Sequence, residues 1–176
     1  MYKTIFLFIF IYLQLTSFGQ DVTYSLNWLS IEEAERKNSL EQKKILIDIY
    51  ADWCYWCKKI DSELASDSVL ANYLNKNFYL VKLNPEDLND INFKNEVYQR
   101  KTFSYSYSDK TRKVNEFVIE LLGNDFIYPS LIFMNEKLDV VLTTKGFKNS
   151  NELNKYIHFI GSNAYQKMKW TEFINK

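Results

Sequence analysis

The pattern of apolar positions predicts a strand, two helical segments and a second strand in the first half of the chain. Residues 45–50 (ILIDIY) and 78–83 (FYLVKL) are apolar runs of the length expected for buried strands. Between them, a helix is predicted to begin near Cys54 and continue to Leu64, and Asp67 can cap a further helical segment. The order of strand, helix and strand implies a crossover connection and parallel pairing.

The second half predicts a helix, a hairpin and a final helix. An amphipathic helix that ends at Gly123 is predicted, because apolar residues recur at the spacing i, i+3, i+4, i+7, i+8. These residues are Val114, Phe117, Val118, Leu121 and Leu122. The short polar connection between runs 130–134 and 138–143 predicts an antiparallel hairpin. The last helix carries Leu153, Tyr156, Ile157 and Ile160, and the tail, with Trp170, Phe173 and Ile174, can add another short helix.

Two further segments have weaker patterns. Ser30 and Glu33 form a capping-box pattern that predicts a short helix to about Arg36, followed by a polar connector over 37–44. Residues 84–113 are polar with little helical periodicity, so we expect a functional excursion or a mobile insertion. The alternating aromatic residues of 103–107 within it either line a substrate groove or form a small edge hairpin. The element order is then βαβ followed by αββα.

The first nineteen residues read as a secretory signal peptide. Lys3 supplies positive charge, 5–13 is an unbroken apolar run, and the small residues Ser17 and Gly19 predict cleavage before Gln20. The alternative is an N-terminal membrane anchor, but this run is shorter than the roughly 20 residues that span a bilayer. After cleavage we expect no stable membrane span. We therefore divide the chain into a signal peptide (1–19) and one domain (20–176), with an N-terminal extension (20–43), an insertion (84–113) and a C-terminal tail (162–176).

Composition removes several classes of function. The 22 basic and 22 acidic residues balance, so we expect no nucleic-acid partner. Two cysteines and one histidine are too few for a multi-bridge scaffold or an ordinary structural zinc site, and we expect no metal. A hydrophobic content of 47% over 176 residues indicates one folded domain, which we expect to be a monomer.

The two cysteines lie three positions apart where the first strand gives way to a helix. The offset allows Cys54 and Cys57 to close a disulfide, and the positive helix N-terminus favours a thiolate. Cys57 shares an apolar stripe with Ile60 and Leu64, so we expect it to be buried and Cys54 to be exposed. Cys54 is then the attacking thiolate and Cys57 the resolving thiol.

Two other interpretations of the cysteine pair remain. Half of a zinc site would need further ligands, and His158, the only imidazole, falls off the apolar stripe of its helix and is predicted to be solvated. A purely structural disulfide would close a very small loop and contribute little stability. Redox chemistry is favoured over both.

The run from Ile47 to Lys58 (IDIYADWCYWCK) resembles the active-site segment of thioredoxin-fold proteins. It is similar in particular to exported bacterial thioredoxin-like proteins with a W-C-x-W-C-K motif and an insertion before the third main helix. The resemblance covers approximately Trp28 to Ile160. It implies an α/β thioredoxin fold with a central mixed sheet flanked by helices.

The resemblance assigns roles to an acid and a lysine. Asp48 matches the buried acid beneath the cysteine pair, and burial on an apolar strand should raise its pKa and suit it to exchange protons with Cys57. Lys82 matches the lysine that neighbours this acid. Taken alone, Lys82 is equally well a lysine whose alkyl chain packs at a strand end.

The resemblance also assigns a rim opposite the cysteines. Pro129 matches the family's cis-proline, which would leave the Tyr128 backbone to pair with an extended substrate peptide. Without the resemblance, a trans proline at the start of a strand is favoured. Gly146 matches a glycine at the same rim and is otherwise a turn glycine.

Aromatic residues surround the first cysteine in sequence. Trp53, Tyr55 and Trp56 predict a collar that docks apolar partner surfaces, although Trp53 can also pack partly into the core. Thioredoxins proper have proline where Trp56 stands, and the residues between the cysteines affect the reduction potential. The direction of the reaction therefore stays open.

Together these features predict a periplasmic or secreted thiol–disulfide oxidoreductase with a part in cell redox homeostasis. Its partners would be protein thiols and disulfides and an unidentified redox partner, and no bound cofactor is needed. Reduction of substrates is favoured, with thiol oxidation or isomerisation as the alternative. Other classes are a redox-silent binding module of the same fold and a Cu(I) carrier, for which neighbouring methionines and histidines are missing.

Overall fold

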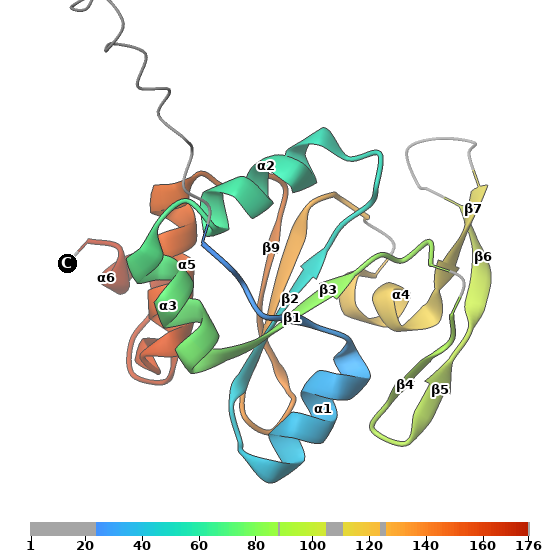
Figure 1. The fold of residues 1–176 in the computed structure, drawn as a ribbon, viewed down its shortest axis with the longest axis horizontal. Coiled ribbons are helices and arrows are strands. Elements are labelled where there is room, and N and C mark those ends of the chain that lie inside the picture. The colour runs from blue at the N-terminus through green and yellow to red at the C-terminus, as the bar shows by residue number, and fades with distance from the viewer. Residues whose placement is uncertain (1–23, 88, 105–110, 124–125, 176) are drawn as a thin grey trace, which may run out of the picture.

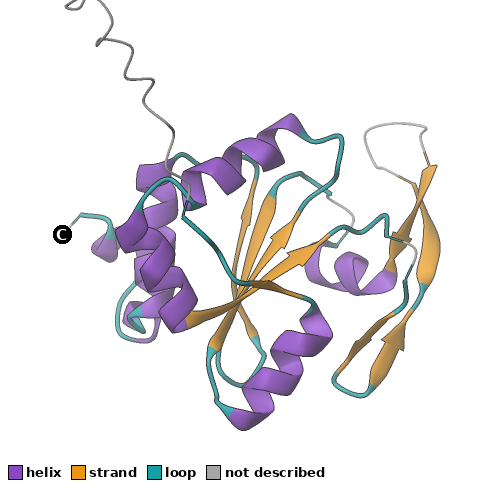
Figure 2. Cartoon of the chain, in the orientation of Figure 1, coloured by secondary structure: helices purple, strands orange, loops and turns teal. Residues whose placement is uncertain are grey.

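A five-stranded mixed sheet lies at the centre of the molecule (Figures 1 and 2). The computed structural model describes residues 24–175 except 88, 105–110 and 124–125, so the predicted signal peptide lies outside the described residues. In spatial order the strands are β1 (Trp28–Leu29), β3 (Phe78–Leu83), β2 (Lys44–Ile49), β8 (Ser130–Met134) and β9 (Val140–Lys145). The first three are parallel, and β8 and β9 run antiparallel to their neighbours.

Helices cover both faces of this sheet. One face carries α1 (Ile31–Leu40) and α4 (Glu116–Leu122), and the other carries α2 (Tyr55–Leu64), α3 (Ser68–Asn77) and α5 (Ser150–Gly161). Side chains of β2 alternate between the two cores, with Ile45 and Ile47 in the first and Leu46 in the second. The predicted α/β thioredoxin fold and its βαβ–αββα order are confirmed.

Side chains that cap helices mark several of these boundaries. The Ser30 hydroxyl accepts the Glu33 N–H at 3.1 Å, and the Asp67 carboxylate accepts the Val69 N–H at 2.8 Å. Both caps were predicted from sequence. Each satisfies one of the N–H groups that the first helical turn leaves without a partner.

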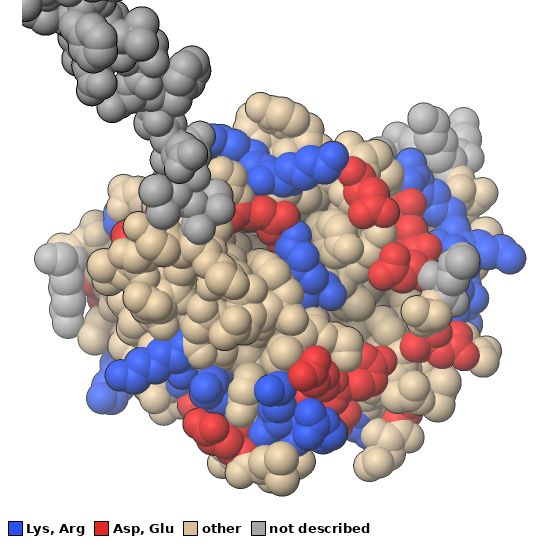
Figure 3. All heavy atoms as spheres, viewed as in Figure 1, with Lys and Arg blue, Asp and Glu red and all other residues tan. Residues whose placement is uncertain are grey.

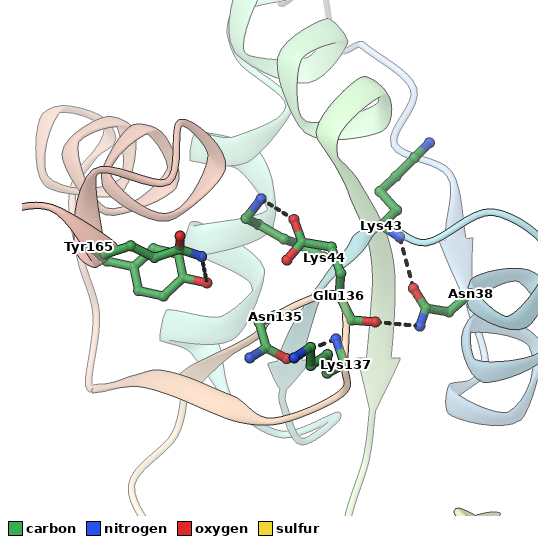
Figure 4. Close-up of polar contacts among 8 residues, drawn as sticks. Asn38, Lys43, Lys44, Asn135, Glu136, Lys137 and Tyr165 are labelled. Atoms are coloured by element: carbon green, nitrogen blue, oxygen red, sulfur yellow. Dashed lines mark hydrogen bonds and ion pairs between the residues drawn. The ribbon is translucent and has the colours of Figure 1, made fainter.

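The helix predicted to end at Arg36 continues to Leu40, so the expected connector over 37–44 is wrong in its first half. In the last turn of the helix, buried Asn38 accepts the Lys43 N–H and donates to the Glu136 carbonyl (Figure 4). The Lys44 ammonium, buried at the start of β2, pairs with the Glu136 carboxylate at 2.6 Å. These contacts tie the end of α1 to the turn between β8 and β9.

Two further boundaries differ from the predictions. Val114 lies on a strand and not on the helix, because Asn115 caps α4 by accepting the Phe117 N–H. Strand β9 begins at Val140 because Leu138 takes a positive φ of 64° in the preceding turn.

The segment 84–113, expected to be a functional excursion or a mobile insertion, contains two antiparallel hairpins. Their strands are β4 (Ile91–Phe93), β5 (Glu96–Tyr98), β6 (Arg100–Ser104) and β7 (Thr111–Asn115). Lys94 and Asn95 form the first turn with positive φ values of 52° and 64°. At the base of the segment, the Asn115 N–H donates to the Pro85 carbonyl at 2.9 Å.

Phe103 bears on the two interpretations of the alternating aromatics in 103–107. It lies on β6 and is buried in the core, which agrees with the edge-hairpin interpretation at this position. Residues 105–107 lie outside the described part of the chain.

The C-terminal tail packs back on α5. As predicted, a short helix, α6 (Trp170–Phe173), follows a 3-10 turn at Ala164–Gln166, and the rings of Tyr156 and Trp170 stack with centroids 4.3 Å apart. His158, predicted to be solvated, is half-buried because its ring contacts that of Tyr73 at 4.1 Å.

The surface carries both signs of charge. On the face shown in Figure 3, basic and acidic side chains are interspersed. Within the described residues, no helix combines the length and the apolar character that crossing a bilayer would require.

Candidate active site

Cys54 is the N-cap of α2. The chain leaves β2 after Ile49, and the Ala51 carbonyl then accepts the Cys54 N–H at 2.9 Å. The Cys54 sulfur in turn accepts the N–H of Cys57 at 3.1 Å. A sulfur in this position receives a helix N–H and the positive end of the helix dipole, and both favour its thiolate form.

Cys54 and Cys57 form a disulfide with an S–S distance of 2.12 Å and Cα atoms 5.3 Å apart. The exposed fractions are 6% for Cys54 and 1% for Cys57, so the predicted burial of Cys57 is confirmed and the predicted exposure of Cys54 is wrong. Tyr50 and Tyr128 pack against the small cluster that Ala51 forms with the two cysteines. The two cysteines remain unequal, because Cys54 lines a surface groove.

The groove has a volume of about 320 Å³ and is mainly aromatic. It is lined by Trp53, Cys54, Tyr55, Trp56, Phe126, Ile127 and Tyr128. The predicted collar is present, with Trp53, Tyr55 and Trp56 exposed by 58%, 70% and 52%. Trp53 therefore lies at the surface, where its ring meets that of Tyr128 edge-on at 5.5 Å.

The opposite rim brings together the residues that the resemblance singled out. The Tyr128–Pro129 peptide bond is cis, and the Pro129 carbonyl accepts the Gly146 N–H at 2.8 Å. Gly146 has φ of +77°, a left-handed conformation in which glycine avoids the strain of a side chain. The next residue, Phe147, contacts the Trp56 ring at 5.0 Å and so joins this rim to the collar.

Asp48 is fully buried as the next-to-last residue of β2. It points to the same face of the sheet as Leu46, which is the face that α2 covers. Lys82 is its partner in the parallel register of β3, and the lysine ammonium lies 3.5 Å from Asp48 Oδ2. Among the described residues, neither carboxylate oxygen of Asp48 has a hydrogen-bond partner.

Lys82 is shared between two carboxylates. Its ammonium lies 2.5 Å from Asp61 Oδ2 on α2, closer than to Asp48, and 4.5 Å from the centre of the Tyr50 ring. This position beside Asp48 agrees with the role implied by the resemblance. Asp61 was not predicted, although its place four residues after Cys57 puts it on the same side of the helix.

Burial dominates the electrostatics of Asp48. Desolvation raises its pKa from 3.8 to about 7, Lys82 opposes the rise, and the negative charge of Asp61 adds to it. A carboxyl with this pKa exists in both protonation states near neutral pH. It can therefore either hold or release a proton on the face of the sheet covered by α2.

Phe126 and Ile127 are groove residues that the sequence analysis did not identify. The sequence feature that could have indicated them is their position, because both lie within three residues of Pro129 in an apolar stretch. Their position at the groove becomes evident only once the strand that follows is placed beside β2.

Comparison with known proteins gives one family and many similar structures. Residues 31–161 match the family described as a thioredoxin-like domain. No curated protein matches the chain.

Three solved structures illustrate the similarity of fold. A thioredoxin-fold protein from Helicobacter pylori aligns with a TM-score of 0.59 and 16% identity over 88% of this chain and 91% of its own. A candidate disulphide-isomerase from Bacteroides thetaiotaomicron aligns with a TM-score of 0.56 and 23% identity over 83% of this chain and 98% of its own. The oxidoreductase DsbH aligns with a TM-score of 0.53 and 13% identity over 84% of this chain and 89% of its own. At these identities the likeness concerns the fold.

Asp48→Asn is expected to stabilise the disulfide form in alkaline solution. The pKa of Asp48 is higher in the folded protein, about 7, than the ordinary 3.8, so its contribution to stability declines as pH rises between these values. Three pKa units correspond to ~4 kcal/mol, offset by ~1–3 kcal/mol for an unpaired buried amide. Urea unfolding should show a gain on the order of 2 kcal/mol at pH 8 and none at pH 4.

Asp61→Asn is the matched control, because its carboxylate is partly exposed and lies closer to Lys82. It should give a smaller gain at pH 8 than Asp48→Asn, because it removes only the contribution of Asp61 to the raised pKa of Asp48 and also loses the ion pair with Lys82. Equal gains at pH 4 and pH 8 for Asp48→Asn would show that Asp48 is not forced to ionise in a buried site.

Proposed function

Because the chain belongs to the thioredoxin-like domain family, we propose that it is a thiol–disulfide oxidoreductase that acts on protein partners through Cys54 and Cys57. The observation that carries this proposal is the position of the Cys54 sulfur. It accepts a helix N–H, and Cys54 lines an aromatic groove. Cys57 is buried, and its sulfur is bonded to that of Cys54. A thiolate stabilised at an accessible groove beside a buried second thiol suits two-step exchange.

In the reducing direction, the Cys54 thiolate attacks one sulfur of a partner disulfide. A mixed disulfide forms, and the other partner sulfur leaves as a thiolate and takes up a proton. Cys57, once deprotonated, attacks the Cys54 sulfur, which closes the Cys54–Cys57 disulfide and releases the second partner thiol. Two electrons pass to the partner, and a dithiol donor protein must then reduce the pair by the reverse steps.

Asp48 is proposed to serve the second step. A carboxyl with a pKa of about 7 can accept the proton of the Cys57 thiol and return it in the reverse reaction. The ammonium of Lys82 stabilises the carboxylate when the proton has left. Asp61 competes for that ammonium and so keeps the pKa of Asp48 high.

Reduction of partners outside the cytoplasm is the direction and compartment that we propose. The compartment rests on the signal-peptide pattern of 1–19. The direction rests on the resemblance to thioredoxins. Oxidation is the competing direction because an oxidising compartment favours it.

Replacing the resolving cysteine should trap partners. In Cys57→Ser, a mixed disulfide through Cys54 cannot be resolved, so partner adducts that dithiothreitol releases should accumulate in cells and appear on non-reducing gels. Cys54→Ser is the matched control and should trap few. Adducts confined to Cys54→Ser would reverse the roles, and adducts with neither variant would favour a redox-silent binding module.

The reduction potential distinguishes the two directions. We expect equilibration of the purified protein with glutathione to give a value near ~−270 mV, as in thioredoxins. A value near ~−120 mV, typical of strong thiol oxidants, would reverse the proposed direction.

Export can be tested by the mature N-terminus. When the full chain is expressed in a secretion-competent bacterium, the protein recovered outside the cytoplasm should begin at Gln20. Recovery of the uncut chain in the membrane fraction would support the anchor instead.

A further inference from the structure

The hairpin formed by β6 and β7 contacts the active-site groove at two points. Phe103 on β6 packs its ring against Phe126 with centroids 4.6 Å apart. Arg112 on β7 places its guanidinium carbon 4.7 Å from the centre of the Trp53 ring. Phe126 and Trp53 both line the groove that contains Cys54.

These two contacts come from one pair of residues. Phe103 and Arg112 are directly opposite each other in the antiparallel register of the hairpin. Residues paired in this way project from the same face of the ribbon. A single face of the hairpin therefore contacts the groove. The contacted residues, Phe126 and Trp53, form part of the groove wall.

Other contacts hold the hairpin in this position. Phe103 is buried in the core between the sheet, α1 and α4. The Arg112 guanidinium pairs with the Glu86 carboxylate at 2.5 Å, which connects β7 to the chain that follows β3. The guanidinium is therefore restrained from both sides, by a carboxylate and by the indole ring.

We propose that Phe103 and Arg112 determine specificity by positioning Phe126 and Trp53, and that the wall so formed selects polypeptide disulfides flanked by apolar side chains. This inference rests on the proposed thiol–disulfide exchange and names the substrate class of the same site. The hairpin acts as a positioning element, and the reacting atoms remain those of Cys54 and Cys57.

Physical chemistry favours an apolar polypeptide as the occupant. The groove is lined by aromatic and aliphatic side chains that continue to the Cys54 sulfur, so residues next to a partner cysteine would lie against them. Trp53 is more than half exposed, and its ring is held by the Tyr128 ring on one side and by the Arg112 guanidinium, so loss of the cation removes one of these two contacts. A small polar disulfide such as oxidised glutathione has no apolar side chain to use this wall.

The test compares exchange rates of the reduced full-length mature protein with three disulfides. Two are cyclic peptides of equal length and charge, one with leucine and one with serine beside its cysteines, and the third is oxidised glutathione. For the wild type, the second-order rate constant should be highest with the leucine peptide. In Arg112→Gln, the ratio of leucine-peptide to serine-peptide rates should fall about fivefold, the size expected for one lost cation–π contact.

Lys113→Gln is the matched control because it removes the same charge from the next residue, whose exposed side chain lies on the other face of β7. It should leave the ratio unchanged. Arg112→Gln should also shift the fluorescence of Trp53, and the shift should vanish when Trp53→Phe is added. If Arg112→Gln does not fold, Glu86→Gln should lower the same ratio by loosening the guanidinium.

The outcomes separate this inference from the function on which it rests. A wild-type protein that exchanges with none of the disulfides would overturn the proposed function. A wild-type protein that exchanges equally with both peptides, or an Arg112→Gln variant that keeps the wild-type ratio, would overturn the inference alone. Equal changes in Arg112→Gln and Lys113→Gln would also overturn it, since only general charge would then matter.

Discussion

The register of β2 between β3 and β8 is the constraint on which the site depends. It sets Asp48 opposite Lys82 on one side and Ile49 opposite Ser130 on the other. The first pairing brings a counter-charge to a buried acid. The second sets the residue after the cis Tyr128–Pro129 bond opposite the end of the strand that leads to Cys54. A shift by one residue would turn every β2 side chain to the opposite face and dissolve both arrangements.

This register has an energetic cost at its centre. A strand buried along its whole length carries a carboxyl group, and the available ammonium lies closer to a second carboxylate than to this one. A core built for stability alone would fill the position with an apolar side chain. The protein instead retains a titratable group with a pKa of about 7 on the face of the sheet beneath α2. Stability is given up at the position for which we propose proton exchange.

Much of the frame could be predicted because its signals are local. Strand 78–83 has the predicted bounds, and the caps at Ser30 and Asp67 lie where their side chains indicated. The cysteine pair and the cis bond before Pro129 followed from a sequence run and a resemblance.

What could not be predicted depends on contacts between distant parts of the chain. Asp61 matters only because α2 lies over Lys82, and the cluster that contains the cysteines is packed against Tyr128, more than seventy residues after Cys54. The hairpin of β4 and β5 was missed because its tight turn at Lys94 and Asn95 takes positive φ without glycine. The role proposed for Arg112 likewise depends on a contact between distant parts of the chain, because it becomes evident only once β7 is placed beside Trp53.

The hydrogen bond between Asn115 and Pro85 has a consequence for how this protein can change over evolution. It fastens the two ends of the 84–113 segment together, so the sheet and the cysteine pair meet that segment as a closed unit. Changes at hairpin positions that lie outside the core can then alter the groove proposed to select partners without moving the strands that hold the thiols. On the role proposed for the β6–β7 hairpin, part of the choice of partner is encoded outside the stretch that carries the thiols, and that part can drift at its own rate.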